Sequence, residues 1–203
     1  MFQLARGIVV PDLTGIHEAF MVRQTDEGRA SFTVNVSADR LQAVFERLSS
    51  CVSAPGFLVL ETGTHSSVEQ ELRKTSQDPF HVDVHFLDQL SHAQVLDLLA
   101  KDGELLVHDG GVRFGFGSHA GMDEVYVGAY KILEIYTDWP EKYLQALAEL
   151  GFDQEVELRT VWKNFSQAAP GSRNVLSSLP RTIWHLLEDL RGQGLYLAER
   201  RAD

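Results

Sequence analysis

The sequence predicts an α+β fold, in which a mainly antiparallel β-sheet carries helices packed chiefly on one face. Two observations lead to this prediction: apolar runs with strand periodicity are joined by short turn sequences, and stripes with helical periodicity lie between several of them. The chain has 203 residues, of which 44% are hydrophobic and 23% charged, which is an ordinary globular composition. We expect a single domain over residues 1–203, with roughly six to nine strands and four to five helices, and with or without a C-terminal appendage from about residue 166 to residue 203.

The first clear elements are a β-hairpin and a helix. The runs 18–24 and 29–36 flank the turn sequence TDEG. Apolar and polar residues alternate in the second run, so we expect one buried and one wet face. Ser37 then caps a helix over residues 38–49, whose apolar residues recur at helical spacing.

Two strand and helix pairs follow. A strand at 57–60 precedes a helix at 66–74, and a strand at 80–87 precedes a helix at 91–102. Both helices begin with a capping-box sequence, in which a serine is followed three residues later by Glu or Gln. The sequence DG is expected to end the second helix.

Residues 104–136 carry the densest β signal and predict three consecutive strands at the centre of the sheet. The sequence DGG between the first two is expected to form a tight hairpin, because glycine accepts a positive φ. The third strand, 124–136, is apolar on both faces, which is typical of a central, doubly covered strand. Gly115 and Gly117 leave one face of the second strand without side chains, so another group can pack closely there.

The C-terminal third predicts further elements of both kinds. Asp138 caps a helix that ends at Leu150, and residues 156–165 are predicted to form a strand. Residues 180–190 predict the last helix, and residues 195–197 predict a short edge strand.

A strand, helix and strand succeed one another around Ser37, Ser91 and Asp138, at an interval of about fifty residues. The side chains of these pseudo-repeats do not align convincingly. Shared supersecondary geometry therefore explains them as well as duplication does.

The net charge of the chain limits the classes of molecule that it can bind. The net charge is −11 and the pI is near 5.1, which disfavours nucleic-acid binding, because that needs a basic surface. The negative charge would attract a basic protein partner and speed the encounter with it. The alternative is an acidic bacterial protein whose charge serves only its solubility.

The sequence also bears on the compartment. No apolar run approaches the roughly 18 residues of a membrane span, so no membrane association is expected, and the N-terminus lacks the succession of a signal peptide. The single cysteine, Cys51, excludes an internal disulfide and fits the reducing cytoplasm.

His81, Asp83 and His85 are the best candidates for chemistry. Strand periodicity puts the two imidazoles and the carboxylate on one face, where they could bind a divalent metal such as zinc or iron. A further ligand would come from the central stretch, namely His108, Asp109 or His119. The alternative is the polar face of a half-exposed strand, with no metal and no other cofactor.

The loop from Gly117 to Asp123 is the most suggestive loop for ligand binding, and Gly117, Ser118, His119 and Asp123 are its candidate residues. Its glycine spacing differs from that of dinucleotide-binding loops, and a strand rather than a helix follows it, so phosphate binding is disfavoured. The alternative is a hairpin loop at the sheet rim.

No motif in the chain names a reaction. The leading hypothesis is a non-enzymatic bacterial interaction protein, of the inhibitor or immunity type, with a basic protein partner. The second is a metal-dependent hydrolase that uses His81, Asp83 and His85. The third is a structural subunit of a homo-oligomer, and the sequence leaves the oligomeric state open.

Overall fold

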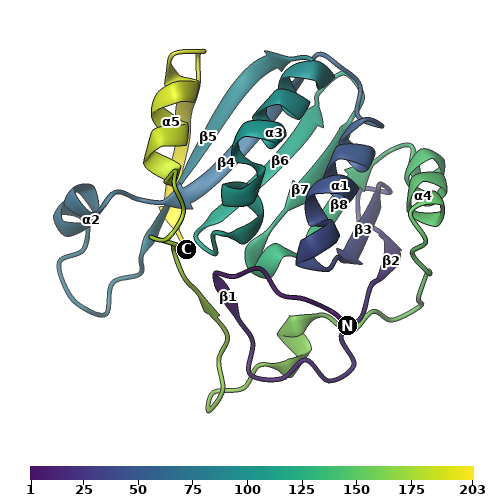
Figure 1. The fold of residues 1–203 in the computed structure, drawn as a ribbon, viewed down its shortest axis with the longest axis horizontal. Helices are drawn as coiled ribbons and strands as arrows, with labels where there is room; N and C mark the ends of the chain where they lie inside the picture. Colours follow the sequence, from purple (N-terminus) through teal and green to yellow (C-terminus); the bar gives the residue numbers. More distant parts are fainter.

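The computed structural model describes residues 1–203 and confirms the α+β fold (Figure 1). One sheet has eight strands: β2 (Ala19–Gln24), β3 (Ala30–Asn35), β4 (Gly56–Gly63), β5 (His81–Leu90), β6 (Val112–Ser118), β7 (Asp123–Val127), β8 (Leu133–Thr137) and β10 (Tyr196–Ala202). Their order across the sheet is β10-β5-β4-β6-β7-β8-β3-β2, and all neighbours are antiparallel. Two short strands, β1 (Ile8–Val9) and β9 (Ser172–Arg173), pair separately.

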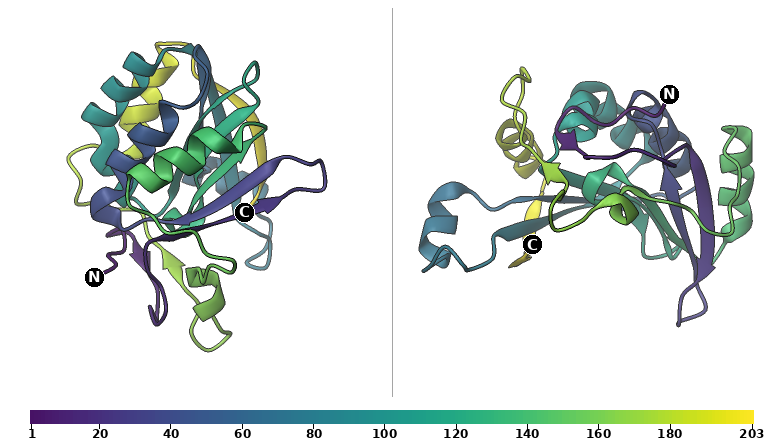
Figure 2. Two further views of the ribbon diagram at one scale, coloured as in Figure 1. Left: turned by 90° about the vertical axis from the view of Figure 1, so that its right-hand side faces the viewer. Right: turned by 90° about the horizontal axis from the view of Figure 1, so that it is seen from below.

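The five helices are α1 (Ala38–Ser49), α2 (Ser66–Leu72), α3 (His92–His108), α4 (Pro140–Glu149) and α5 (Ile183–Arg191). Four of them, α1, α3, α4 and α5, send apolar side chains into one core against the same face of the sheet (Figures 1 and 2). Helix α2 instead sits at the tip of an arm between β4 and β5, and Glu69 is its only buried residue (Figure 1). None of these helices combines the length and the apolar character that crossing a bilayer would need.

Strand alternation decides which side chains enter the core. Phe32, Phe114 and Phe116 are completely buried on the helical face. Phe114 packs against Phe45 of α1, with ring centroids 4.8 Å apart. Burying each such ring stabilises the fold by roughly 1.5–3 kcal/mol, so this layer fixes the sheet under the helices.

The N-terminal prediction is confirmed. β2 and β3 form the expected hairpin, and α1 spans residues 38–49 as predicted. Its predicted apolar stripe is buried: Leu41, Val44, Phe45 and Leu48. Helix α1 then connects β3 to β4 across the helical face, above the three strands that separate them in the sheet.

The predicted strand at 104–107, and the hairpin after it, are wrong. These residues form the end of α3, which continues through Asp102 and Gly103 to His108. Asp102 is buried because Arg181 pairs with it at 2.6 Å, and Gly103 lies where α3 closely approaches Gln42 of α1. Within α3, Asp102 and Gly103 therefore mark contacts with Arg181 and Gln42, and they do not mark the end of the helix.

The predicted strand at 124–136 is two strands. β7 and β8 form a hairpin, and the chain turns at Tyr130 and Lys131, which both have positive φ. The Lys131 side chain is buried in spite of its charge. The turn does contain a glycine, Gly128, whose amide donates to the Ile132 carbonyl oxygen at 2.9 Å, but the positive φ angles fall on Tyr130 and Lys131, where the sequence carries no turn signal.

The predicted strand at 156–165 is also wrong. The segment is irregular except for a single turn of 3-10 helix at Val161–Asn164, and Val156 is fully exposed. Leu158 packs on Ala19 and Met21 of β2. Trp162 is exposed as well, so the apolar alternation of this segment does not mark one buried face of a strand.

The last segment packs onto the main core. Helix α5 places Ile183, Leu186, Leu187 and Leu190 in it, and β10 pairs with β5 at the sheet edge.

Of the three predicted pseudo-repeats, β3-α1-β4 and β5-α3-β6 are strand–helix–strand units, whereas α4 is followed by irregular chain until β9.

Candidate functional site

One face of the eight-stranded sheet carries no helix, and we call it the open face (Figure 2). Strand alternation projects every second side chain onto it. A groove of about 320 Å³ lies on this face, and it is lined by Val59, Glu61, Val84, Phe86, Glu124, Tyr126, Glu134, Tyr136, Glu199 and Arg201. The groove thus combines apolar and aromatic side chains with four glutamates and one arginine.

An aromatic row borders the groove. His119 stacks on Phe57 with ring centroids 4.6 Å apart, Phe57 contacts Phe86 at 5.4 Å, and Phe86 stacks on Tyr196 at 6.4 Å. These rings come from the β6–β7 loop, β4, β5 and β10, so strands far apart in the sequence build one surface. Aromatic side chains of this kind supply large contact area at protein interfaces.

The two glycines of β6 let aromatic side chains of the neighbouring strands pack closely over this strand. A Cβ atom on Gly117 would lie 2.5 Å from Phe57, and one on Gly115 would lie 2.9 Å from Tyr126. The face of β6 that lacks side chains is therefore covered by neighbouring rings. A larger residue at either position would push Phe57 or Tyr126 out of place.

The negative charge of Glu61, on the open face, is neutralised by two arginines. It is buried, and its two oxygens accept from Arg113 at 3.0 Å and from Arg201 at 2.7 Å. Arg113 also pairs with Asp203. The charge of Glu61 is thus used within the protein, and this carboxylate is not available to a partner.

Glu124 and Glu134 differ from Glu61 because no basic side chain pairs with them. Each sits beside a tyrosine of the other strand, in the cross-strand pairs Glu124–Tyr136 and Tyr126–Glu134. Burial raises the pKa of both carboxyl groups, and the nearby charge of Glu61 raises that of Glu124 further. The one hydrogen bond to either carboxylate comes from the Tyr136 hydroxyl, which donates to Glu134 at 3.3 Å.

This arrangement fits a cation. Glu124 and Glu134 are diagonal neighbours on the hairpin, with Cβ atoms about 7 Å apart, so one guanidinium or ammonium group could approach both. Half-buried carboxylates without a positive partner are costly, and an incoming cation would remove that cost. Tyrosine rings beside the carboxylates can also contact the cation through their faces.

The four candidate residues of the predicted ligand loop do not form one accessible site, although Ser118 and Asp123 are cross-strand partners. Gly117 lies beneath Phe57, and Ser118 is buried, where its Oγ accepts from the Gly121 amide at 3.3 Å. Asp123 is buried and pairs with Lys142 of α4 at 2.5 Å. Only His119 is exposed, on the open face. Ligand binding by this loop as a unit stays a prediction.

His81, Asp83 and His85 share one face of β5, as the alternation predicts, but that face is not solvated. Asp83 forms a bidentate pair with Arg200 at 2.6 and 2.8 Å, and β10 covers this edge of β5. His85 is buried, and burial lowers its pKa. The expectation of a wet polar face was wrong, because this is the face of the sheet that carries the helices: His85 lies opposite the core residue Leu60 and two positions before the core residue Leu87.

A metal centre at these residues stays a prediction. The Nδ1 atom of His81 lies 3.1 Å from Glu69, so each of the first two candidate ligands already has a partner within the protein. No group of three or more His, Cys, Asp or Glu side chains is arranged to hold a metal ion.

The sequence carries a signal for the open-face glutamates. The strands β7 and β8 both contain a Glu-x-Tyr sequence with an aliphatic middle residue, at Glu124–Tyr126 and at Glu134–Tyr136. Read with period two, each motif points a carboxylate and a phenol away from the core. The signal becomes visible only once the run 124–136 is divided into two strands.

No protein-family model, no curated protein and no solved structure matches this chain.

Proposed function

We propose that this chain is a non-enzymatic binding protein whose open face takes an arginine- or lysine-bearing segment of a basic protein partner. The observation that carries the proposal is the pair of half-buried carboxylates, Glu124 and Glu134, which have no cationic partner and lie between Tyr126 and Tyr136. An inhibitor- or immunity-type role is the form of this proposal that suits the acidic chain.

The chemistry favours arginine over lysine as the central contact. A guanidinium group is planar, can bind two carboxylates, and stacks on aromatic rings, which matches the mixed glutamate and tyrosine surface. The net charge of −11 would also attract a basic partner over a distance and speed its encounter.

A second copy of the chain is a less suitable occupant of the open face. Two identical faces would bring the Glu124 and Glu134 carboxylates of both copies together without intervening cations, and like charges in contact are destabilising. A homo-oligomer through this face would therefore first have to protonate these groups. Its mass would then increase at acid pH and not at neutral pH.

The binding proposal is tested with the double variant E124Q/E134Q. Titration of the ¹⁵N-labelled protein with a tri-arginine peptide is expected to give saturable shifts of the amides of β7 and β8. The double variant should bind at least about tenfold more weakly, since it loses charge-assisted hydrogen bonds worth about 1.4 kcal/mol or more.

The matched control is E27Q/E157Q, which removes the same charge from two exposed glutamates that form no ion pair. It should bind as the wild type does. If both double variants lose affinity equally, the peptide senses only the net charge, and the proposal for this face is refuted.

The same variant makes a prediction about stability that needs no partner. Because burial raises the folded-state pKa of Glu124 and Glu134, the folded protein binds protons more tightly than the unfolded chain, and it loses stability as the pH rises through that window. E124Q/E134Q should therefore be more stable than the wild type at neutral pH, by up to about 1 kcal/mol, or roughly 2–4 °C in Tm. The gain should disappear at acid pH in thermal melts, and a less stable variant at neutral pH would contradict this account.

A further inference from the structure

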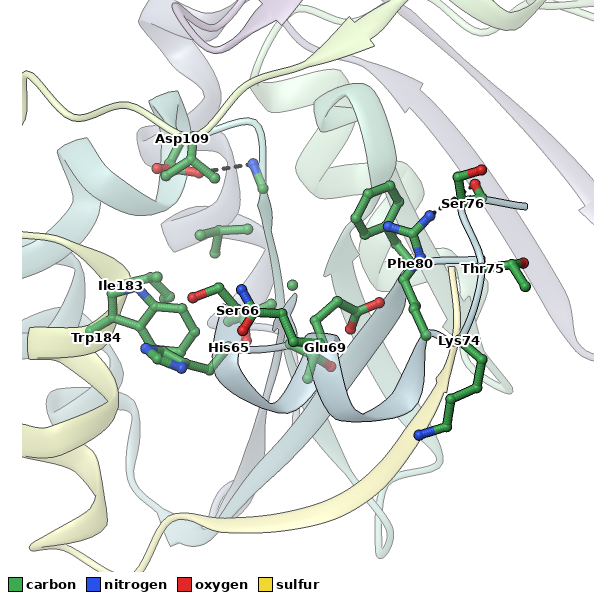
Figure 3. Close-up of a pocket in the computed structure, with 18 residues that line it drawn as sticks. His65, Ser66, Glu69, Lys74, Thr75, Ser76, Phe80, Asp109, Ile183 and Trp184 are labelled. Atoms are coloured by element: carbon green, nitrogen blue, oxygen red, sulfur yellow. Dashed lines mark hydrogen bonds between the residues drawn. The ribbon is translucent and has the colours of Figure 1, made fainter. Parts of the chain in front are cut away.

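A second cavity lies between the arm that carries α2 and the body of the fold (Figure 3). It is a cleft of about 770 Å³, within the range of small-molecule sites. Its walls come from the end of β4, from α2 and the loop after it, from the start of β6 and from the first turn of α5.

One wall of the cleft is aromatic and aliphatic. Trp184 of α5 and His65 before α2 meet edge to face, with ring centroids 4.9 Å apart, and Ile183 continues this wall. Phe80 stands on the other side, where the Arg73 guanidinium covers its ring at 3.9 Å. Figure 3 shows Glu69 between these two groups of side chains.

The basic side chains at the rim are already engaged. Arg73 donates to the carbonyl oxygens of Asp78 and Ser76, at 2.9 and 3.1 Å, and Lys74 donates to the Glu71 carbonyl oxygen at 2.5 Å. Their donors thus hold the loop after α2 together. The cleft is not built to present free cations to an anionic ligand.

The cleft contains buried hydrogen-bond acceptors that have no donor. One oxygen of Glu69 accepts from the backbone and the ring of His81, both at 3.1 Å, but its second oxygen is buried and has no partner. The hydroxyl oxygen of Thr62, which also lines the cleft, is likewise buried and unpaired. Each unsatisfied acceptor is costly, and a carboxylate is more costly than a hydroxyl.

We propose that this cleft binds a small organic cation, namely an amine or amidine attached to an aromatic body. The cationic nitrogen would donate to Glu69, and the body would lie against Trp184 and His65. Glu69 is the only buried residue of α2, and its unpaired oxygen is the acceptor that the arm offers to the ligand. The cleft shares no lining residue with the groove on the open face.

The test uses benzamidine and its neutral isostere benzamide. Tryptophan fluorescence and amide shifts of residues 62–76 and 183–184 should show benzamidine binding in the millimolar range, at least about tenfold more tightly than benzamide. E69Q should abolish this preference, while it keeps the acceptor for His81. E71Q removes an equal charge from an exposed position of the same helix and should leave binding unchanged.

A thermal melt of E69Q checks that the variant is folded, and W184L provides a second test, because it should weaken the binding of both probes. Equal affinity for the two probes, unchanged binding by E69Q, or shifts only in β7 and β8 would overturn the proposal. Benzamidine binding that survives in E124Q/E134Q would show that the cleft and the open face act separately.

Discussion

Replacing Gly110 by alanine should destabilise the protein by about 3 kcal/mol, because three backbone segments meet at this residue. A Cβ atom on Gly110 would lie 2.4 Å from the Gly7 carbonyl oxygen and 2.7 Å from the Asn174 nitrogen. Both contacts are with backbone, so no side chain can rotate away. The clash would separate segments that two hydrogen bonds join: the Gly110 amide donates to Asn174 at 3.0 Å, and the Asn174 amide donates to Gly7 at 2.7 Å.

Denaturant unfolding measures the loss, and hydrogen exchange locates it at the Asn174 amide. G63A is the control, because a Cβ atom on Gly63 would meet nothing within 4 Å and its φ is not positive. Its stability should stay within about 0.5 kcal/mol of the wild type. A G110A variant as stable as G63A would mean that the three segments are not held together as described.

Gly110 also explains why the sequence predicted a strand where α3 in fact ends. The sequence DGG after an apolar run is typical of a hairpin, but the Gly110 φ is not positive. It is glycine because the chain crosses Gly7 and Asn174 there. Those partners are 103 and 64 positions away in the sequence, by the subtraction of residue numbers, and local patterns carry no trace of them.

Elements whose signal is local were predicted well. The β2–β3 hairpin has its turn sequence, α1 has a complete apolar stripe, and the Ser91 side chain and Gln94 form the predicted capping box of α3. Some failures concern residues whose role depends on distant partners, such as Asp102 with Arg181, whereas the β7–β8 turn was missed because Tyr130 and Lys131 carry its positive φ angles. Neither the groove nor the cleft could be predicted, because strand order decides which side chains line them.

Lys131 provides the second large effect. It is buried at the tip of the β7–β8 turn, and its Nζ donates to the Leu106 carbonyl oxygen at 2.7 Å and to that of Val112 at 2.6 Å. It thereby satisfies one of the last carbonyl groups of α3, which has no partner within the helix. Burial lowers the pKa of Lys131 to about 7, against the opposing effect of Asp109 and with a further lowering by Arg113 and Arg173.

The contribution of Lys131 to the stability of the wild type should therefore rise with pH above about 7. In that range the folded amine has lost its proton, whereas the amine of the unfolded chain keeps it until near pH 10.5, so the unfolded state binds more protons. One proton corresponds to a slope of up to about 1.4 kcal/mol per pH unit. Below pH 7 both states are protonated, and this contribution no longer changes with pH.

K131M isolates this contribution, because methionine has a similar length and does not titrate. The variant leaves two buried carbonyl groups without their donor, at a cost of about 1 kcal/mol or more each, so it should be less stable than the wild type at alkaline pH. Its deficit should shrink as the pH falls towards 7, where the wild type must bury a charge and K131M does not. Unfolding by denaturant at several pH values gives both curves, and other titrating groups cancel in their difference. Parallel curves would mean that the buried amine keeps its proton, held by Asp109 and the two carbonyl oxygens, and that α3 is capped by a charged lysine at every pH in this range.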